Sequence, residues 1–331
     1  MMIRSVFRTA LWRGAAGEGG GAADIDTTAS WERRDASVNL ESAPQAAYVA
    51  RMPELPEVER AARRLAAAAT GRTIVRLVVT HPALGRHLTP RQRRTLAGRR
   101  IVAVDRRGKH QRIGLDDGRS LDVHFRMNGD WDIGRTADPE PRFARATIDL
   151  DDGTRIALVD SRALSVVVLR ARGDDSLDTL GPEPGDASFT AATLGAALAR
   201  KRGPIKPALL DQRVVAGLGN IYAAESLWHA GISPRAPAAR LSAARRARLV
   251  TAIRLVLELR PAARYTDDVG PSRWNVYDRE GQPCRRCAGT IRRIVQAARS
   301  TYYCPRCQHR APLCSSALLI RLSAKYRTMR T

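Results

Sequence analysis

Four cysteines near the end of the chain have the spacing of a metal site. They form two Cys-x2-Cys pairs, Cys284 with Cys287 and Cys304 with Cys307, and sixteen residues separate the pairs. Each pair can direct two thiolates at one tetrahedral ion, and two pairs on a hairpin close the site. We therefore predict one structural zinc ion, because four sulfur ligands leave no open position for chemistry. The alternative is two reduced thiol pairs without metal, and Cys314 lies outside the spacing.

A glycine-rich stretch, GLGNIYAAESL at residues 217–227, predicts a tight turn that leads into a helix. Backbone N–H groups at such a turn and at the helix N-terminus can bind a phosphate, and Asn220 could donate from its side chain. As a bare pattern, a Gly-x-Gly turn is more often only a connector between helices.

The segment PELPEVERAARRL, residues 53–65, has the features of a helix N-terminus. Pro56 suits the first turn, and Glu57 and Glu59 follow it at the positive end of the helix dipole. The helical composition continues to Gly71, which predicts the stop.

Between residue 72 and about 182, β-branched runs alternate with turn signals. Asp117-Gly118 and Asp152-Gly153 predict tight hairpins, so this region reads as an antiparallel sandwich. The predicted strands are 73–79, 100–104, 111–115, 120–125, 146–150, 155–159 and 165–169.

The rest of the chain changes character at GPEPGD, residues 181–186, which predicts a domain boundary. Helical spacing follows in four stretches, and short strands return around the cysteines from Asn275 onward. The helical stretches are 189–201, 206–215, 221–231 and 241–259.

Charge favours a polyanionic partner. The 331 residues carry a net charge of +23. Six arginines balance six carboxylates before Met52, so the whole excess lies after it. DNA or RNA is the expected partner, although arginine can also serve only to keep a protein soluble. No apolar run has the length of a membrane span, which excludes an integral membrane protein of the helical class.

Five motifs together resemble the formamidopyrimidine-DNA glycosylase and endonuclease VIII family, with the formamidopyrimidine branch favoured. They are PELPEVE after Met52, RRGKH around Lys109, HFRMNGDW at 124–131, GLGNIYAAESL, and the four-cysteine ribbon. The matches run from Met52 to about Gln308.

The resemblance implies an α+β multidomain fold. Its parts are a catalytic antiparallel β-sandwich with an N-terminal helix at 52–182, a helix-two-turns-helix DNA-binding domain at 183–274, and a β-hairpin zinc finger at 275–310. Residues 1–51 are expected to be an extension that is disordered or absent from the mature protein, and residues 311–331 a tail.

The implied activity is that of a bifunctional DNA glycosylase and abasic-site lyase that removes oxidised bases. A proline at the mature N-terminus offers a secondary amine that can attack the sugar carbon of a damaged nucleoside and form an iminium. Pro53 would take this role after initiation at Met52 and removal of that methionine. The alternative is that Pro53 only starts a helix.

Other site residues follow from the resemblance alone. Glu54 is expected to protonate the departing base or the opening sugar, with Glu57 in support. Lys109 and Arg299 are expected to contact the lesion or its phosphates and to assist elimination. Without the family, such side chains would more often be dipole partners or solvated charges.

The resemblance also implies DNA contacts. Met127 and Arg162 would fill the hole left by the extracted base, and Leu164 stands where relatives usually have a phenylalanine. Further phosphate contacts are implied at Arg202, Lys206 and Asn220, and at Arg145, where many relatives have a histidine.

Substrate preference is expected to follow from the segment 263–283, which looks shorter than the lesion-covering stretch of 8-oxoguanine enzymes. A more open pocket would favour oxidised pyrimidines or opened-ring purines.

The expected partner is damaged double-stranded DNA, bound by a monomer in the bacterial cytoplasm at the nucleoid, without a membrane. The alternatives are a noncatalytic damaged-DNA-binding protein of the same fold and a zinc-ribbon module of a transcription or RNA factor.

Overall fold

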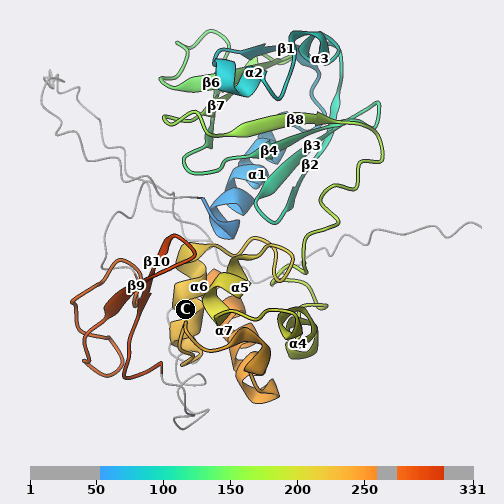
Figure 1. Cartoon of the computed structure of the whole chain (residues 1–331). Helices are drawn as coiled ribbons and strands as arrows, with labels where there is room; N and C mark the ends of the chain where they lie inside the picture. The colour runs from blue at the N-terminus through green and yellow to red at the C-terminus, as the bar shows by residue number, and fades with distance from the viewer. Residues whose placement is uncertain (1–52, 259–273, 309–331) are drawn as a thin grey trace, which may run out of the picture. The chain divides into compact units, whose positions relative to one another are not determined.

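The computed structural model describes residues 53–258 and 274–308 (Figure 1). The predicted extension at 1–51, the tail at 311–331 and the first part of the segment 263–283 lie outside the described residues. Within the described ranges, no helix combines the length and the apolar character needed to cross a membrane.

The first helix, α1 (Leu55–Ala69), confirms the predicted N-terminal signal. Glu54 caps it, Pro56 lies in its first turn, and the Glu54 N–H donates to the Glu57 carboxylate at 3.0 Å. The buried side chains recur every three or four residues, so one face packs against the strands. That face consists of Val58, Ala61, Ala62, Leu65 and Ala69.

Two four-stranded antiparallel sheets follow, as the sandwich prediction requires. One sheet has the order β1 (Ile74–Val79), β6 (Ala144–Leu150), β7 (Thr154–Val159), β5 (Asp130–Arg135). The other has the order β2 (Ile101–Arg107), β3 (His110–Leu115), β4 (Ser120–His124), β8 (Val166–Arg170). Their facing apolar side chains and the buried face of α1 form one core.

The two hairpins predicted from the Asp-Gly pairs are confirmed. Asp117-Gly118 joins β3 to β4 and Asp152-Gly153 joins β6 to β7, and both glycines have positive φ, as tight hairpins need. The prediction missed β5 because its apolar alternation consists of two residues alone, Trp131 and the partly buried Ile133. It also missed the single-turn helices α2 (Pro82–Gly85) and α3 (Pro90–Arg94).

The helical region contains α4 (Ala191–Ala199), α5 (Ile205–Leu210), α6 (Asn220–His229), the 3-10 turn η1 (Ala238–Arg240) and α7 (Ala243–Glu258). The helical prediction for 206–215 is too long, since α5 ends at Leu210. The Asp211 carboxylate there accepts the Arg213 N–H at 3.0 Å, a local turn that competes with helix continuation.

The last described part is a two-stranded hairpin, β9 (Arg292–Gln296) and β10 (Arg299–Tyr303). It packs on α6 through a small core that includes Trp228, Val276, Ile291 and two of the four cysteines. The start of β10 is bonded to the start of α6, because the Asn220 side chain donates to the carbonyl of Ser300, the residue after Arg299, at 3.1 Å.

Candidate active site

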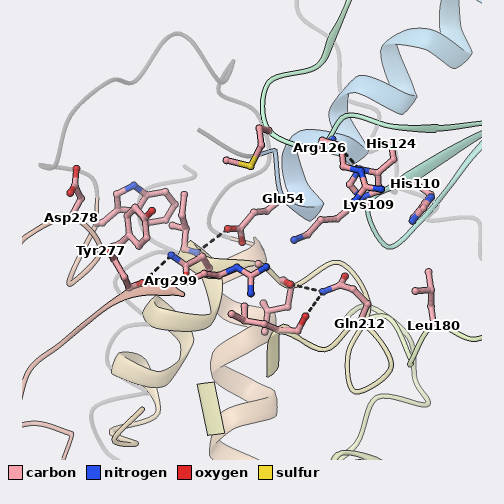
Figure 2. A pocket seen from close by; sticks show the side chains of 18 residues that line it. Glu54, Lys109, His110, His124, Arg126, Leu180, Gln212, Tyr277, Asp278 and Arg299 are labelled. Carbon is pink, nitrogen blue, oxygen red and sulfur yellow. Dashed lines mark hydrogen bonds between the residues drawn. The ribbon is translucent and has the colours of Figure 1, made fainter. Parts of the chain in front are cut away.

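A cavity of about 720 Å³ gathers side chains from segments far apart in the sequence (Figure 2). Its walls come from the start of α1, the β2–β3 turn, the loop after β4, the 210–221 segment and the finger hairpin. Five of the sequence-predicted residues line it: Glu54, Lys109, Met127, Asn220 and Arg299.

Glu54 lies where two helices meet by their N-termini. It is the N-cap of α1, and its buried carboxylate accepts the backbone N–H groups of Ile221 at 2.8 Å and Tyr222 at 3.3 Å, in the first turn of α6. Burial raises the pKa of Glu54, against the opposing influence of Lys109 and of these N–H groups. The side chain is therefore suited to hold a proton at a pH where an ordinary carboxyl has lost it.

The glycine turn is needed for this approach. A Cβ at Gly219 would lie 2.2 Å from the carboxylate carbon of Glu54, and one at Gly217, where φ is +81°, would lie 2.4 Å from the Leu55 side chain. The sequence predicted a phosphate site at this turn. In the structure, the first N–H groups of α6 bind Glu54 instead.

Glu57 supports Glu54 through hydrogen bonds. One of its oxygens accepts the Glu54 N–H, and the other accepts the Tyr222 hydroxyl at 2.8 Å. Sequence reasoning missed Tyr222, because a tyrosine in an apolar helix gives no signal beyond burial.

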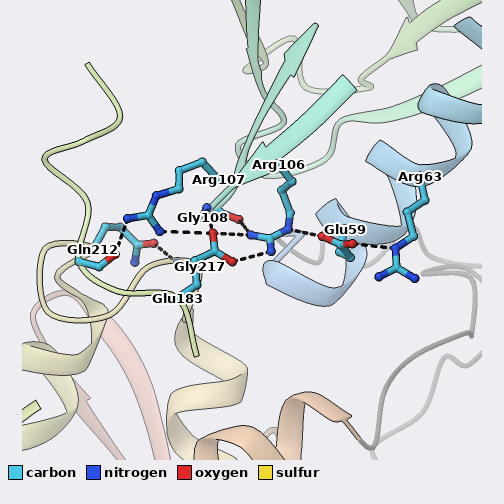
Figure 3. A network of polar contacts seen from close by, with 9 residues as sticks. Glu59, Arg63, Arg106, Arg107, Gly108, Glu183, Gln212 and Gly217 are labelled. Atoms are coloured by element: carbon cyan, nitrogen blue, oxygen red, sulfur yellow. Dashed lines mark hydrogen bonds and ion pairs between the residues drawn. The ribbon is translucent and has the colours of Figure 1, made fainter. Parts of the chain in front are cut away.

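Lys109 is carried by the turn between β2 and β3, as predicted, and a partly buried ionic network holds that turn (Figure 3). The Glu183 carboxylate accepts the Gly108 N–H at 2.6 Å and one Arg106 nitrogen at 2.8 Å. Arg106 also pairs with Glu59 on α1 and donates to the Gly108 carbonyl at 3.0 Å. The network thus joins the turn to both α1 and the segment after the sandwich.

The charge state of Lys109 is set by its surroundings. Burial lowers its pKa, Arg299 acts in the same direction, and Glu54 and Glu57 act against them. The four groups are electrostatically coupled around one cavity, which is the arrangement expected where protons are exchanged.

Lys206 is fully buried rather than exposed to a phosphate. Its ammonium donates to the Ser300 carbonyl at 3.0 Å, to the Thr301 hydroxyl at 2.7 Å and to the Asn220 side chain. Asn220 also donates to the Ser300 carbonyl, at 3.1 Å. In the described structure, both residues therefore fasten the hairpin next to Arg299. Burial lowers the pKa of Lys206 to about 8.

Other predicted residues lie outside the cavity. Pro53 is buried beside Glu54, and its nitrogen is acylated by Met52 in the chain as printed. Arg202 is exposed between α4 and α5. Arg162 and Leu164 are exposed on the loop between β7 and β8.

Two histidines were missed by sequence reasoning. His110 and His124 line the cavity, with ring centroids 4.6 Å apart. Burial, together with the charge of His110, lowers the pKa of His124 to about 3, so its imidazole is neutral, and its Nδ1 accepts the Arg126 N–H at 2.9 Å. The missed signal is their cross-strand pairing, since His110 on β3 lies opposite His124 on β4.

The four predicted cysteines come together. Their sulfurs all lie within 4.8 Å of one another, with 3.5 Å between Cys287 and Cys304 and 3.9 Å between Cys284 and Cys307. A tetrahedral zinc with bonds of about 2.3 Å needs sulfurs about 3.8 Å apart, so the cluster fits one structural zinc ion. The Trp228 indole donates to the Cys284 sulfur at 3.3 Å and ties the site to α6.

Three family models match successive parts of the chain. They are the formamidopyrimidine-DNA glycosylase N-terminal domain at 52–167, the formamidopyrimidine-DNA glycosylase H2TH domain at 180–263, and the zinc finger found in FPG and IleRS at 281–310.

Individual proteins match over most of the chain. It is 44% identical over 271 residues to the formamidopyrimidine-DNA glycosylase of Chloroflexus aggregans, a match that covers 78% of this chain and 98% of that protein. A MutM in complex with DNA that contains carbocyclic 8-oxo-G matches with a TM-score of 0.72 and 29% identity. The Lactococcus lactis Fpg with abasic-site DNA matches with a TM-score of 0.72 and 28% identity. Both structural matches cover 78% of this chain and all of the other.

Proposed function

The chain belongs to the formamidopyrimidine-DNA glycosylase family, and on that premise we propose that Pro53, once it is the N-terminal residue, is the nucleophile. The protein is a DNA glycosylase of oxidised-base repair, and cleavage at abasic sites is the activity known for its family. It carries one structural zinc ion, at its four-cysteine finger.

The proposed reaction begins with the free secondary amine of Pro53, which attacks the sugar carbon bearing the damaged base. The bond from that carbon to the base breaks, and the base leaves with the electron pair and takes up a proton. The amine then loses its proton, and an iminium forms as the bond from the same carbon to the ring oxygen breaks and that oxygen takes up a proton. Elimination of the 3′ phosphate, and then of the 5′ phosphate, would cut the strand.

The observation that carries this proposal is the position and state of Glu54. Its carboxyl follows Pro53 directly, lines the cavity and has a pKa raised by burial, so it can supply the proton that the leaving base or the ring oxygen needs. Lys109 and Arg299 line the same cavity and offer positive charge for the phosphates flanking the lesion.

The remaining assignments are part of the same proposal. Met127, Arg162 and Leu164 would fill the gap left by the extracted base, and Arg202, Lys206, Asn220 and Arg145 would act on the DNA backbone directly or through neighbouring loops. We further propose that the protein acts as a monomer in the bacterial cytoplasm, at the nucleoid, where its DNA substrate lies. Formamidopyrimidines and oxidised pyrimidines are the preferred lesions we propose.

The test is excision from a panel of duplexes, each with one oxidised base opposite each normal base, by protein that begins at Pro53. We expect base release and strand cleavage, fastest for formamidopyrimidine or oxidised-pyrimidine duplexes. If the full-length form, in which Pro53 is acylated, releases the base equally fast, Pro53 is not the nucleophile. Fastest release of 8-oxoguanine opposite cytosine would overturn the lesion preference.

A further inference from the structure

Three loops at one end of the sandwich are bonded to one another. The Asp160 N–H donates to the Phe143 carbonyl at 3.0 Å, which joins the β7–β8 loop to the β5–β6 loop. The Asn128 side chain donates to the Ser161 hydroxyl, which joins the β7–β8 loop to the loop that carries Met127. The three loops therefore form one continuous surface feature.

The β7–β8 loop is preformed by a buried carboxylate. Asp160 is 1% exposed and accepts the N–H groups of Arg162 at 2.9 Å, Leu164 at 2.8 Å and Ser165 at 2.7 Å. Arg145 also stabilises this loop, because its side chain donates to the Asp160 carbonyl at 2.6 Å. Arg162 and Leu164 are thus held at the surface by their own backbone.

Each of the three loops contains one non-glycine residue in the left-handed region. These are Arg126 with φ +56°, Phe143 with φ +66° and Ala163 with φ +52°. Such backbone is unfavourable for a side chain as bulky as phenylalanine and persists where neighbouring contacts impose it, often at binding sites.

Phe143 is exposed in this setting. Five large apolar side chains of the described residues are exposed, and three of them are valines on strands β1, β2 and β9. The other two are Phe143, at 42%, and Leu164, at 44%, on loops that are bonded to each other. An aromatic ring left in water at a strained backbone position has no explanation in the fold itself.

Positive charge surrounds the ring. The guanidinium carbons of Arg142 and Arg145 lie 4.6 and 5.6 Å from its centroid, and the exposed Arg162 follows on the neighbouring loop. Arginines with an exposed aromatic ring and an apolar side chain are the composition of a surface that binds the phosphates and stacks on the bases of a nucleic acid.

We propose that Phe143 contacts the DNA strand opposite the lesion and stacks on a base there, next to Arg162 and Leu164. This inference rests on the proposed function, which places those two residues in the gap left by the extracted base, and that gap faces a base of the opposite strand. Phe143 supplies an aromatic face where Leu164 offers only an aliphatic one. The residue would stabilise the duplex from the undamaged side while the cavity holds the extracted nucleotide.

The experiment measures equilibrium binding to a duplex with a stable tetrahydrofuran abasic analogue. Phe143→Ala should weaken binding roughly 5- to 150-fold, the range for loss of one base–aromatic stack. Phe143→Trp should retain affinity, and Phe143→Leu should weaken binding because it keeps bulk but loses the ring. Val102→Ala is the matched control, since Val102 is 48% exposed on β2 outside these loops, and it should bind as the wild type does.

The strand is identified by 2-aminopurine placed at successive positions of either strand of the same duplex. Wild-type protein should change the fluorescence at a position of the undamaged strand, and Phe143→Ala should reduce that change. A change confined to the damaged strand overturns the strand assignment. Wild-type affinity of Phe143→Ala overturns the contact itself.

Two further variants separate this inference from the proposed function. If Arg162→Ala weakens binding and Phe143→Ala does not, the inference fails and the function stands. If Glu54→Gln excises damaged bases as fast as the wild type, the proposed chemistry fails whatever Phe143 does. Both Phe143 and Val102 are surface residues, so thermal unfolding of each variant checks that the fold is kept.

Discussion

Glu54 has the environment that a proton donor needs. Its carboxyl is buried, which favours the neutral form, yet two helix N–H groups and Lys109 favour the charged form. Because the two influences oppose each other, the group can change its protonation state during a reaction without leaving its place.

Glu54→Gln should slow base excision about 100-fold or more, the lower range for loss of a general acid. In the wild type, the raised pKa means that the protonated form persists above the ordinary carboxyl range, and the rate falls as pH rises through that pKa. The pH–rate profile of single-turnover excision measures this descending limb, which the glutamine variant should lack.

The same group should affect stability with a defined sign. The folded state binds the Glu54 proton more tightly than the unfolded state, so its contribution to stability is lost as pH rises through the folded pKa. Glu54→Gln should therefore gain thermal stability relative to the wild type between pH 5 and pH 8. A difference that shrinks over this range would contradict the buried-acid description.

At the residue scale, the sequence predicts which residues belong to the site better than it predicts the contacts that each of them makes. It placed Glu54, Lys109 and Arg299 in one site, and the cavity contains all three. The resemblance implied that Lys206 contacts a DNA phosphate, whereas the structure buries its side chain against the finger hairpin. A lysine next to other charges carries no sign of contacts that lie 94 residues away.

At the scale of elements, the site depends on α1 and α6 meeting closely. The glycine turn before α6 allows the contact, and the ionic network at the β2–β3 turn fixes the approach of Lys109 from the other side (Figures 2 and 3).

Gly219→Ala should misplace Glu54, because the new methyl group would lie 2.2 Å from the carboxylate carbon. A displacement of about 1 Å costs on the order of 100-fold in rate, so we expect a loss of that size in base excision. Gly203→Ala is the control, since a Cβ there meets nothing within 4 Å. Equal rates for both variants would show that this close approach is not required.

Glu183→Ala should loosen the Lys109 turn, because the buried Gly108 N–H and Arg106 lose their shared acceptor. Water would reach Lys109, and its pKa should rise toward 10.5. The chain has four lysines, so carbon-13 NMR of labelled lysine side chains can follow Lys109 directly.

The matched control for Glu183 is Asp149→Ala. Asp149 also accepts from two arginines, Arg76 and Arg155, but on the sheet of β6. It should leave the Lys109 titration unchanged. A Lys109 pKa that is the same in the wild type and in Glu183→Ala would contradict the positioning role of this network.

Most elements could be predicted because their signals are local. A proline followed by carboxylates predicted α1, and hairpin glycines with β-branched runs predicted seven of the eight sandwich strands. The Arg106–Glu183 pair could not be predicted from the sequence. Its members are 77 residues apart, and each alone looks like an ordinary surface charge.

At the scale of the molecule, the zinc finger is joined to the active site by α6. Trp228 on α6 donates to Cys284, while Asn220 at the start of α6 and Lys206 hold the strand that begins with Arg299. We therefore expect zinc binding at the four cysteines to affect the position of Arg299.

Removal of zinc by a chelator should abolish abasic-strand cleavage while the sandwich remains folded. Elemental analysis should find one zinc per chain before treatment, and the fluorescence of Trp228 should change on its loss. Cys304→Ser tests the same link without a chelator. Full cleavage activity in zinc-free protein would contradict the coupling.

The most direct test of the whole account is to trap the protein on damaged DNA with borohydride and map the attachment by mass spectrometry. Protein that begins at Pro53 should form the adduct, with the DNA fragment bonded to the nitrogen of Pro53. An adduct located at Lys109, or one formed equally by a chain in which residues 1–52 still precede Pro53, would contradict it.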